Sequence, residues 1–177
     1  MRRLIPRCEK MNTINILRIY WITLVILVLP VLNSGVAKGE ITTVTYQVSA
    51  WVDNAFSSRY VQYMSYIYLR VGYRYEEPPP YTMCAMRFRD VNVPQGALIL
   101  DARLKIRGHS NGGELLYGVI HAEDADNPAD FSGRYIRDIV KTDAEVNWDP
   151  ILYWDSGKLY PSADISTMVQ EVIDRPG

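Results

Sequence analysis

Cysteine is nearly absent from this sequence, which contains only Cys8 and Cys84 among 177 residues. Cys8 lies in a basic N-terminal segment that we interpret below as a leader, so the remaining chain has one thiol and no partner for an internal disulfide. This excludes the small secreted folds that depend on several disulfide bonds. Cys84 lies in the apolar stretch Met83–Met86, which favours a buried structural thiol over a reactive one.

Histidine and the common catalytic motifs are also scarce. The two histidines, His109 and His121, are predicted in a turn and at the end of a strand, and neither accompanies a nucleophile motif such as G-x-S-x-G. The sequence contains no H-E-x-x-H motif, no paired cysteines for zinc and no glycine-rich phosphate loop before a helix. We therefore expect no enzymatic activity. The alternative is a fragment of a secreted hydrolase, because paired carboxylates on a β-sandwich would leave no sequence motif.

Long apolar runs are limited to one, from Ile19 to Leu32. Basic residues precede it, and the small residues Gly35 and Ala37 follow it. This order is typical of a secretory signal peptide, with cleavage after Ala37. A membrane-spanning helix needs about 20 apolar residues, and this run is shorter, so a retained anchor is the alternative interpretation.

The predicted organisation is therefore a signal peptide over residues 1–37 and one module over residues 38–177. We expect the module to be secreted, either extracellular or in the cell envelope, and to meet a membrane only through an uncleaved signal segment. Its length is sufficient for one domain with a hydrophobic core.

Excess positive charge is absent from the predicted module. The whole chain has 19 basic and 20 acidic residues, and five basic residues and one acidic residue lie before Lys38. The module keeps 14 basic and 19 acidic residues, a net charge of −5. Proteins that bind nucleic acid non-specifically need a basic face to neutralise phosphates, so we expect no nucleic-acid partner.

The module is rich in strand-forming patterns. Residues 41–52 are dominated by Thr, Val and Tyr, and residues 66–73 alternate as a half-buried strand does. Residues 83–93 predict a further strand before the turn at Pro94-Gln95-Gly96.

The clearest alternation covers residues 97–107. It predicts an inward face of Leu98, Leu100, Ala102, Leu104 and Ile106 opposite a charged face. The Asn-Gly turn chemistry of residues 109–113 follows, so residues 97–121 are predicted to form an antiparallel hairpin.

One helix is predicted, over residues 164–174. Its apolar residues recur at helical spacing, Asp164 or Ser162 can cap its start, and Arg175-Pro176-Gly177 ends it. Many short strands with one short helix predict a mostly β fold, an antiparallel β-sandwich.

An acidic loop is the candidate metal site. The oxygen ligands would come from Glu123, Asp124, Asp126 and Asp130, since calcium prefers several hard oxygens from flexible positions. The spacing differs from an EF-hand, so a bound calcium would be structural. The favoured alternative is a solvated loop in which Asp and Asn cap their own turns. We expect no other cofactor.

Aromatic residues are the candidate ligand-binding groups. The chain has 13 tyrosines and 4 tryptophans but only 3 phenylalanines. Tyr and Trp combine an apolar face with a polar edge, which suits sugar rings and protein interfaces. The candidates are Tyr66 and Tyr68, which share one face of a predicted strand, together with Trp148 and Trp154. The alternative is that these rings fill the core, and for the two tryptophans the core is favoured.

A set of short motifs resembles a known family. The motifs are Met86-Arg87-Phe88, Val93-Pro94-Gln95-Gly96-Ala97, Ala125-Asp126-Asn127, and the closing stretch from Gln170 to Arg175-Pro176-Gly177. They are similar to DNRLRE-type, carbohydrate-binding-like jelly-roll modules of bacterial secreted and cell-surface proteins. The resemblance covers residues 86–177 well and 41–85 loosely. Members of this family continue past Arg-Pro-Gly with further strands, so it implies a C-terminally truncated module.

The resemblance implies an architectural role for the shared residues and no catalytic residue. Together with the aromatic content, it predicts a module that binds carbohydrate or cell-surface material as part of an extracellular protein. The alternative from another class is a structural or adhesive spacer without a small ligand.

Overall fold

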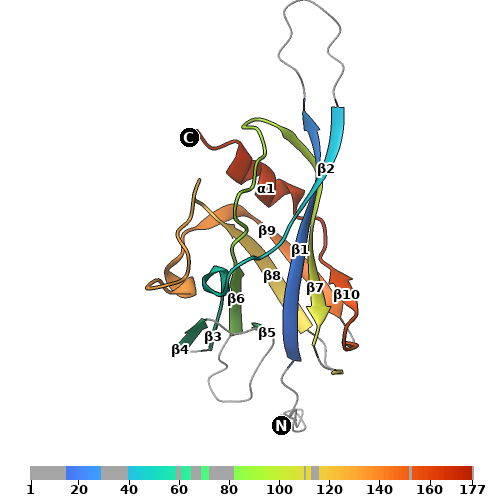
Figure 1. Ribbon diagram of the computed structural model, residues 1–177, viewed down its shortest axis with the longest axis vertical. Coiled ribbons are helices and arrows are strands. Elements are labelled where there is room, and N and C mark those ends of the chain that lie inside the picture. The colour runs from blue at the N-terminus through green and yellow to red at the C-terminus, as the bar shows by residue number, and fades with distance from the viewer. Residues whose placement is uncertain are drawn as a thin grey trace, which may run out of the picture.

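The computed structural model describes residues 15–28, 40–58, 61–64, 69–71, 82–109, 111–112, 116–151 and 153–176. Most of these residues lie in antiparallel strands, with two short 3-10 helices and one α-helix (Figure 1). The mostly β fold class predicted from the sequence is confirmed. The elements are β1 (Asn15–Val28), β2 (Glu40–Tyr46), η1 (Trp51–Asp53), β3 (Asn54–Ser58), β4 (Val61–Met64), β5 (Leu69–Val71), β6 (Thr82–Met86), β7 (Leu98–Gly108), β8 (Leu116–Glu123), η2 (Ile136–Asp138), β9 (Lys141–Ile151), β10 (Leu159–Pro161) and α1 (Ser166–Ile173).

The strands form three antiparallel sheets. The largest has the order β10-β7-β1-β2, with β5 also paired to β1. A second sheet has the order β4-β3-β6, and β8 pairs with β9 alone. Side chains of the large sheet and of the β8–β9 pair meet in one hydrophobic cluster, so these two sheets enclose the main core.

The main core is built from alternate residues of β7, as the sequence pattern predicts. Ala102, Leu104 and Ile106 are all buried, and Leu24 and Ile26 of β1 join them. The rest of the buried set consists of Ala97, Ile99, Trp154, Ile165 and Met168. Burying aliphatic side chains of this size contributes roughly 1.5–3 kcal/mol each, so this cluster is a principal source of stability.

The start of β7 departs from the predicted alternation. Leu98 and Leu100, predicted to face inward, are 46% and 42% exposed, whereas Ile99 is buried. The pairing register with β1 shifts between Val25 and Ile26, which leaves an extra residue in β7. Because a β-bulge adds one residue to one strand, it reverses which side chains face the core.

The predicted hairpin over residues 97–121 is wrong. β7 pairs with β1 on one side and with β10 on the other, and β8 pairs with β9. The two strands are neighbours in sequence but lie in different sheets. Two other predicted strands are shorter than expected, because β2 ends at Tyr46 and β6 ends at Met86. Of the strand predicted over residues 66–73, β5 is present, and the remaining residues lie outside the described part of the chain.

The predicted helix is confirmed as α1, which packs between β7 and β9 (Figure 1). The predicted cap residues are wrong, because the N-cap position is Ile165 and no side chain makes a cap hydrogen bond there. Asp164, one residue earlier, accepts a hydrogen bond from the N–H of Ser166 at 3.0 Å. The same carboxylate accepts the N–H of Ala102 in β7 at 3.0 Å. Ser162, the alternative cap, instead accepts the N–H of Leu104. Both side chains therefore attach the segment before α1 to the large sheet.

β1 lies inside the segment predicted to be a signal peptide. It is hydrogen-bonded to β2 over Ile22–Val28 and to β7 over Leu17–Leu27. Cleavage after Ala37 remains a prediction, and its consequence for the sheet is considered below. Among the described residues, no helix has the length and apolar content needed to cross a membrane.

Candidate binding surface

An exposed aromatic side chain begins η1. Trp51 is 59% exposed, whereas Asp53, at the other end of the same short helix, is fully buried. Alternating exposure within one helical turn places the indole outward and the carboxylate inward. The local sequence does not mark Trp51 as a binding residue, because Trp51 continues the β-like pattern of residues 41–52.

Two ion pairs to a buried carboxylate hold η1 in place. Asp53 Oδ1 accepts a hydrogen bond from Arg87 Nη1 at 3.1 Å, and Arg89 Nε lies 2.6 Å from Oδ2. The N–H of Arg87 also donates to the Asp53 carbonyl at 2.8 Å. The contact of its guanidinium with the Asp53 carboxylate raises the pKa of Arg89 above its ordinary value. The segment after β6 therefore anchors the carboxylate two residues from Trp51.

A second exposed ring lies on the segment that contacts η1. The N–H of Phe131 donates to the Val52 carbonyl at 3.0 Å, and the Phe131 ring is buried beside Ala55 and Ile136. Tyr135 follows Phe131 by four residues and is 50% exposed. We call the exposed faces of Trp51 and Tyr135 the Trp51–Tyr135 surface.

Gln62 of β4 fixes the backbone on both sides of Tyr135. Its Nε2 donates to the Arg134 carbonyl at 2.5 Å, and its Oε1 accepts the N–H of Ile136 at 2.7 Å. The Arg137 guanidinium lies 4.8 Å from the centre of the Tyr135 ring, within the range of a cation–π contact. Tyr135 is therefore an exposed ring on a backbone that is held from two sides.

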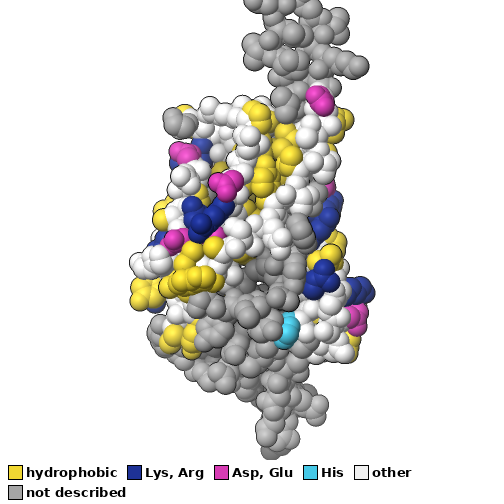
Figure 2. Space-filling model, viewed as in Figure 1, with side chains coloured by type: hydrophobic (Ala, Val, Ile, Leu, Met, Phe, Trp, Pro, Cys, Tyr) yellow, Lys and Arg dark blue, Asp and Glu magenta, His cyan; other side chains and the backbone are white. Residues whose placement is uncertain are grey.

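Charged groups lie on the segments that carry these rings or contact them. Hydrogen bonds from the hydroxyl and the N–H of Ser132 lower the pKa of Asp130, and the charges of Arg87 and Arg89 act in the same direction. Figure 2 shows hydrophobic side chains gathered over η1 and the loop before η2, with basic and acidic side chains next to them. The surface thus combines apolar ring faces with fixed hydrogen-bonding charges.

The two predicted tryptophan sites are core residues. Trp154 is 1% exposed, which corrects its prediction as a ligand-binding residue, because stacking on a ligand needs an accessible ring face. Its ring meets the edge of Trp148 at 6.3 Å between centres, and Tyr160 lies 4.5 Å away. Trp148 is partly buried and packs on the same core. Tyr66 and Tyr68 lie outside the described residues, so their prediction is neither supported nor opposed.

The acidic loop is organised by arginines and a serine. Glu123 pairs with Arg134, and Asp124 and Asp126 both pair with Arg175. Asp130 accepts hydrogen bonds from Ser132. Within the part of the chain that the structure describes, no three carboxylate, histidine or cysteine side chains come together as a metal site. The calcium hypothesis gains no support from this geometry.

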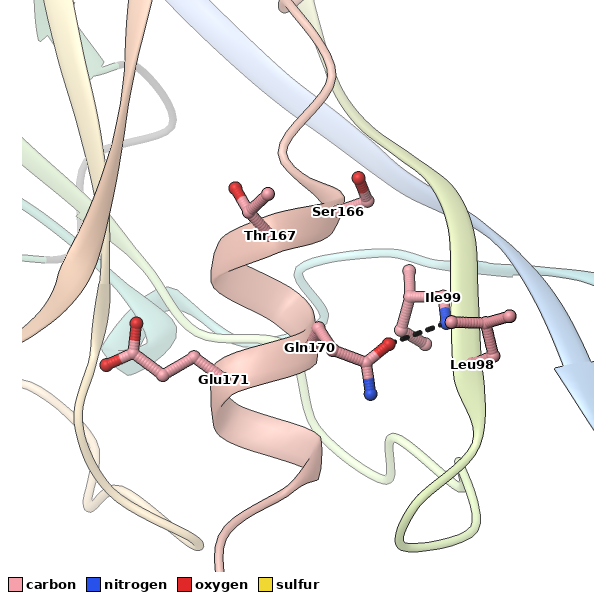
Figure 3. A pocket seen from close by; sticks show the side chains of 6 residues that line it. All are labelled: Leu98, Ile99, Ser166, Thr167, Gln170 and Glu171. Atoms are coloured by element: carbon pink, nitrogen blue, oxygen red, sulfur yellow. Dashed lines mark hydrogen bonds between the residues drawn. The ribbon is translucent and has the colours of Figure 1, made fainter.

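A groove lies between α1 and the start of β7 (Figure 3). It has a volume of about 380 Å³ and is lined by Leu98, Ile99, Ser166, Thr167, Gln170 and Glu171. Gln170 bridges the N–H of Ile99 and the carbonyl of Ala97, and Glu171 accepts the N–H groups of Asp143 and Ala144. These polar groups hold α1 against the sheets, so the groove offers a ligand little beyond apolar contact.

The surroundings of Cys84 favour the predicted structural, unreactive thiol. It lies on β6, paired with Phe56 of β3, and burial raises its pKa to about 12. A thiol with that pKa stays protonated at neutral pH and is a poor nucleophile.

The comparisons with known proteins identify no relative. No family model matches the chain, and neither the curated proteins nor the solved structures include a significant match.

Proposed function

We propose that this chain is a secreted, non-catalytic β-rich module that binds glycan or other cell-surface material at the Trp51–Tyr135 surface. The proposal keeps the function expected from the sequence and moves the binding residues to a different pair of aromatic rings. The observation that carries it is the exposure of two large aromatic side chains on two hydrogen-bonded segments.

The physical basis is the chemistry of sugar recognition. A pyranose ring presents apolar C–H faces, which stack on Trp and Tyr, and hydroxyl groups, which need polar partners. Arg89 and Asp130 supply a donor and an acceptor close to η1. Exposed rings whose backbones are already held lose little conformational freedom on binding, which reduces the entropic cost.

The test is a glycan-array screen of the protein secreted from cells that express the full chain, followed by affinity measurements on variants. We expect selective binding to one class of polysaccharide. Trp51→Ala and Tyr135→Ala should each weaken it by roughly 5- to 100-fold, as expected for losing about 1–3 kcal/mol of stacking.

The matched control is Tyr153→Ala. Tyr153 is 51% exposed but lies between β9 and β10, so its removal should leave the affinity unchanged. Equal losses of affinity in all three variants would show that any exposed aromatic ring contributes to glycan binding, and that this surface has no special role. A blank array from folded protein would favour the structural or adhesive spacer instead.

A further inference from the structure

The position of β1 in the large sheet is a feature that the proposed binding function does not explain. It separates β2 from β7 in the large sheet and pairs antiparallel with both. Seven positions are paired with β2 and ten with β7. Without β1, two rows of backbone N–H and C=O groups would face each other across a gap one strand wide.

The same strand contributes to the hydrophobic core. Leu24 and Ile26 are 1% and 3% exposed and pack with Ile99, Leu104 and Ile106. Val25, between them, points to the other face and is only partly buried. The gap would therefore have two apolar sockets, two residues apart along the strand.

The same residues are predicted from the sequence to belong to a cleaved signal peptide. The cut predicted after Ala37 lies between β1 and β2. Signal peptidase would hydrolyse one peptide bond there, with water supplying the hydroxyl of the new Ala37 carboxylate and the proton of the new Lys38 amine. After that step, β1 is held in the sheet only by non-covalent contacts.

We propose that the position of β1 is an exchangeable strand site, which after cleavage accepts an extended segment of another polypeptide. The incoming segment runs antiparallel to both β2 and β7 and carries aliphatic side chains at the positions of Leu24 and Ile26. This inference rests on the export that the proposed function assumes, but it concerns a different face of the molecule.

The chemistry of the site selects its occupant. Two facing strand edges need backbone donors and acceptors at strand spacing, which an extended peptide provides and a helix, a sugar or a lipid does not. The two sockets then distinguish one peptide from another by alternate side chains. In the intact chain the occupant is β1 itself, with Leu24 and Ile26 in the two sockets.

The experiment uses the full chain with a specific protease site introduced between Val28 and Glu40, so that β1 can be cut from β2 in the folded protein. The probe is a fluorescent peptide of residues 15–28 with a solubilising lysine tail. Three variants of the peptide carry Leu24→Asp, Ile26→Asp or Val25→Asp.

We expect the cut protein to take up the labelled peptide and the uncut protein to exclude it. Leu24→Asp and Ile26→Asp should weaken uptake by at least about 100-fold, because each would bury an unpaired carboxylate. Val25→Asp should bind within about tenfold of the parent, because its side chain reaches solvent.

Two results would overturn the proposal. One is a cut protein that stays folded and never exchanges β1, even with excess peptide. The other is equal uptake of all four peptides, which would mean non-specific adsorption. Glycan binding is measured separately, on the secreted protein without added peptide or protease, so either proposal can fail while the other stands.

Discussion

At the scale of single residues, Asp53 is the most consequential polar group. Its carboxylate is fully buried between Arg87 and Arg89 and connects η1 to the segment after β6. Removing one partner from a buried charged contact leaves the others without compensation. The partly exposed arginines can regain water, so the cost is smaller than for a wholly buried pair.

We expect Asp53→Asn to lower the free energy of unfolding by about 2 kcal/mol, measured by urea denaturation. Asp138→Asn is the matched control, because Asp138 lies 3.6 Å from Arg137 with both side chains more than half exposed. Exposed pairs contribute about 0–1 kcal/mol. Similar losses in both variants would contradict a special role for the buried carboxylate.

Gly108 is a second residue whose role depends on its neighbours. A Cβ at this position would lie 2.4 Å from the carbonyl oxygen of Asp155. The backbone of Gly108 also exchanges hydrogen bonds with the turn before β10, donating to Lys158 and accepting from Gly157. Only glycine allows this close approach of the two backbones.

We expect Gly108→Ala to lower the thermal unfolding midpoint, with a loss of about 1–3 kcal/mol as the turn moves away. Gly118→Ala is the control, since its Cβ would make an ordinary contact, 3.9 Å from Trp148 Cβ. The idea is untenable if Gly108→Ala is as stable as Gly118→Ala.

At the scale of elements, α1 is attached to β7 by charge as well as by packing. Partial burial tends to raise the pKa of Asp164, but hydrogen bonds from the N–H groups of Ala102 and Ser166 outweigh it and lower the pKa. The carboxylate is therefore better stabilised in the folded chain than in the unfolded chain, whose Asp pKa is about 3.9. Its contribution is complete above that value and is lost as pH falls through the lower folded pKa.

We expect Asp164→Ala to cost about 1 kcal/mol at pH 7, and the difference from the wild type to shrink as pH falls below about 4. Thermal unfolding followed by circular dichroism across this range tests it. Ser166→Ala removes only the hydrogen bond that the Ser166 hydroxyl donates to Asp164 Oδ2, so it should cost less. A wild-type advantage that is independent of pH would argue against the carboxylate as the cause.

The elements also show how far local patterns predict structure. The alternation of residues 102–106 and the helical spacing before Arg175 predicted a strand and a helix that are both present. The same alternation failed at Leu98 and Leu100, because a bulge against β1 reverses the faces there. The bulge depends on the partner strand, which local periodicity does not specify.

At the scale of the whole molecule, the main core joins parts that are distant in the chain. Leu24 of β1, Leu104 of β7 and Met168 of α1 belong to one buried cluster. β1 therefore contributes to folding in the intact chain, while its sequence also has the features of a leader. The peptide-exchange experiment addresses this double role, because it asks whether the sheet tolerates replacement of that strand.

The sequence also could not predict which aromatic rings are exposed at the candidate site. Tyr and Trp content predicted aromatic binding residues, but only tertiary contacts determine which rings are covered. Trp154 is enclosed by Trp148 and Tyr160, whereas Trp51 and Tyr135 extend from segments held by Asp53 and Gln62. Exposure depends on neighbours from elsewhere in the chain, and nothing in the local sequence around Trp51 marks it.

By itself, the sequence determined the properties that follow from nearest neighbours along the chain. These are the mostly β class, the helix with Asp164 at its start, the inward face of residues 102–106 and the absence of a disulfide framework. The tertiary structure alone decided that β7 pairs with β1 and β10, and that Trp51 and Tyr135 remain exposed. It also decided that Arg175 forms ion pairs with Asp124 and Asp126 of the acidic loop. The reason is that strand edges and charged side chains accept many partners, so the choice among them rests on contacts between residues far apart in sequence.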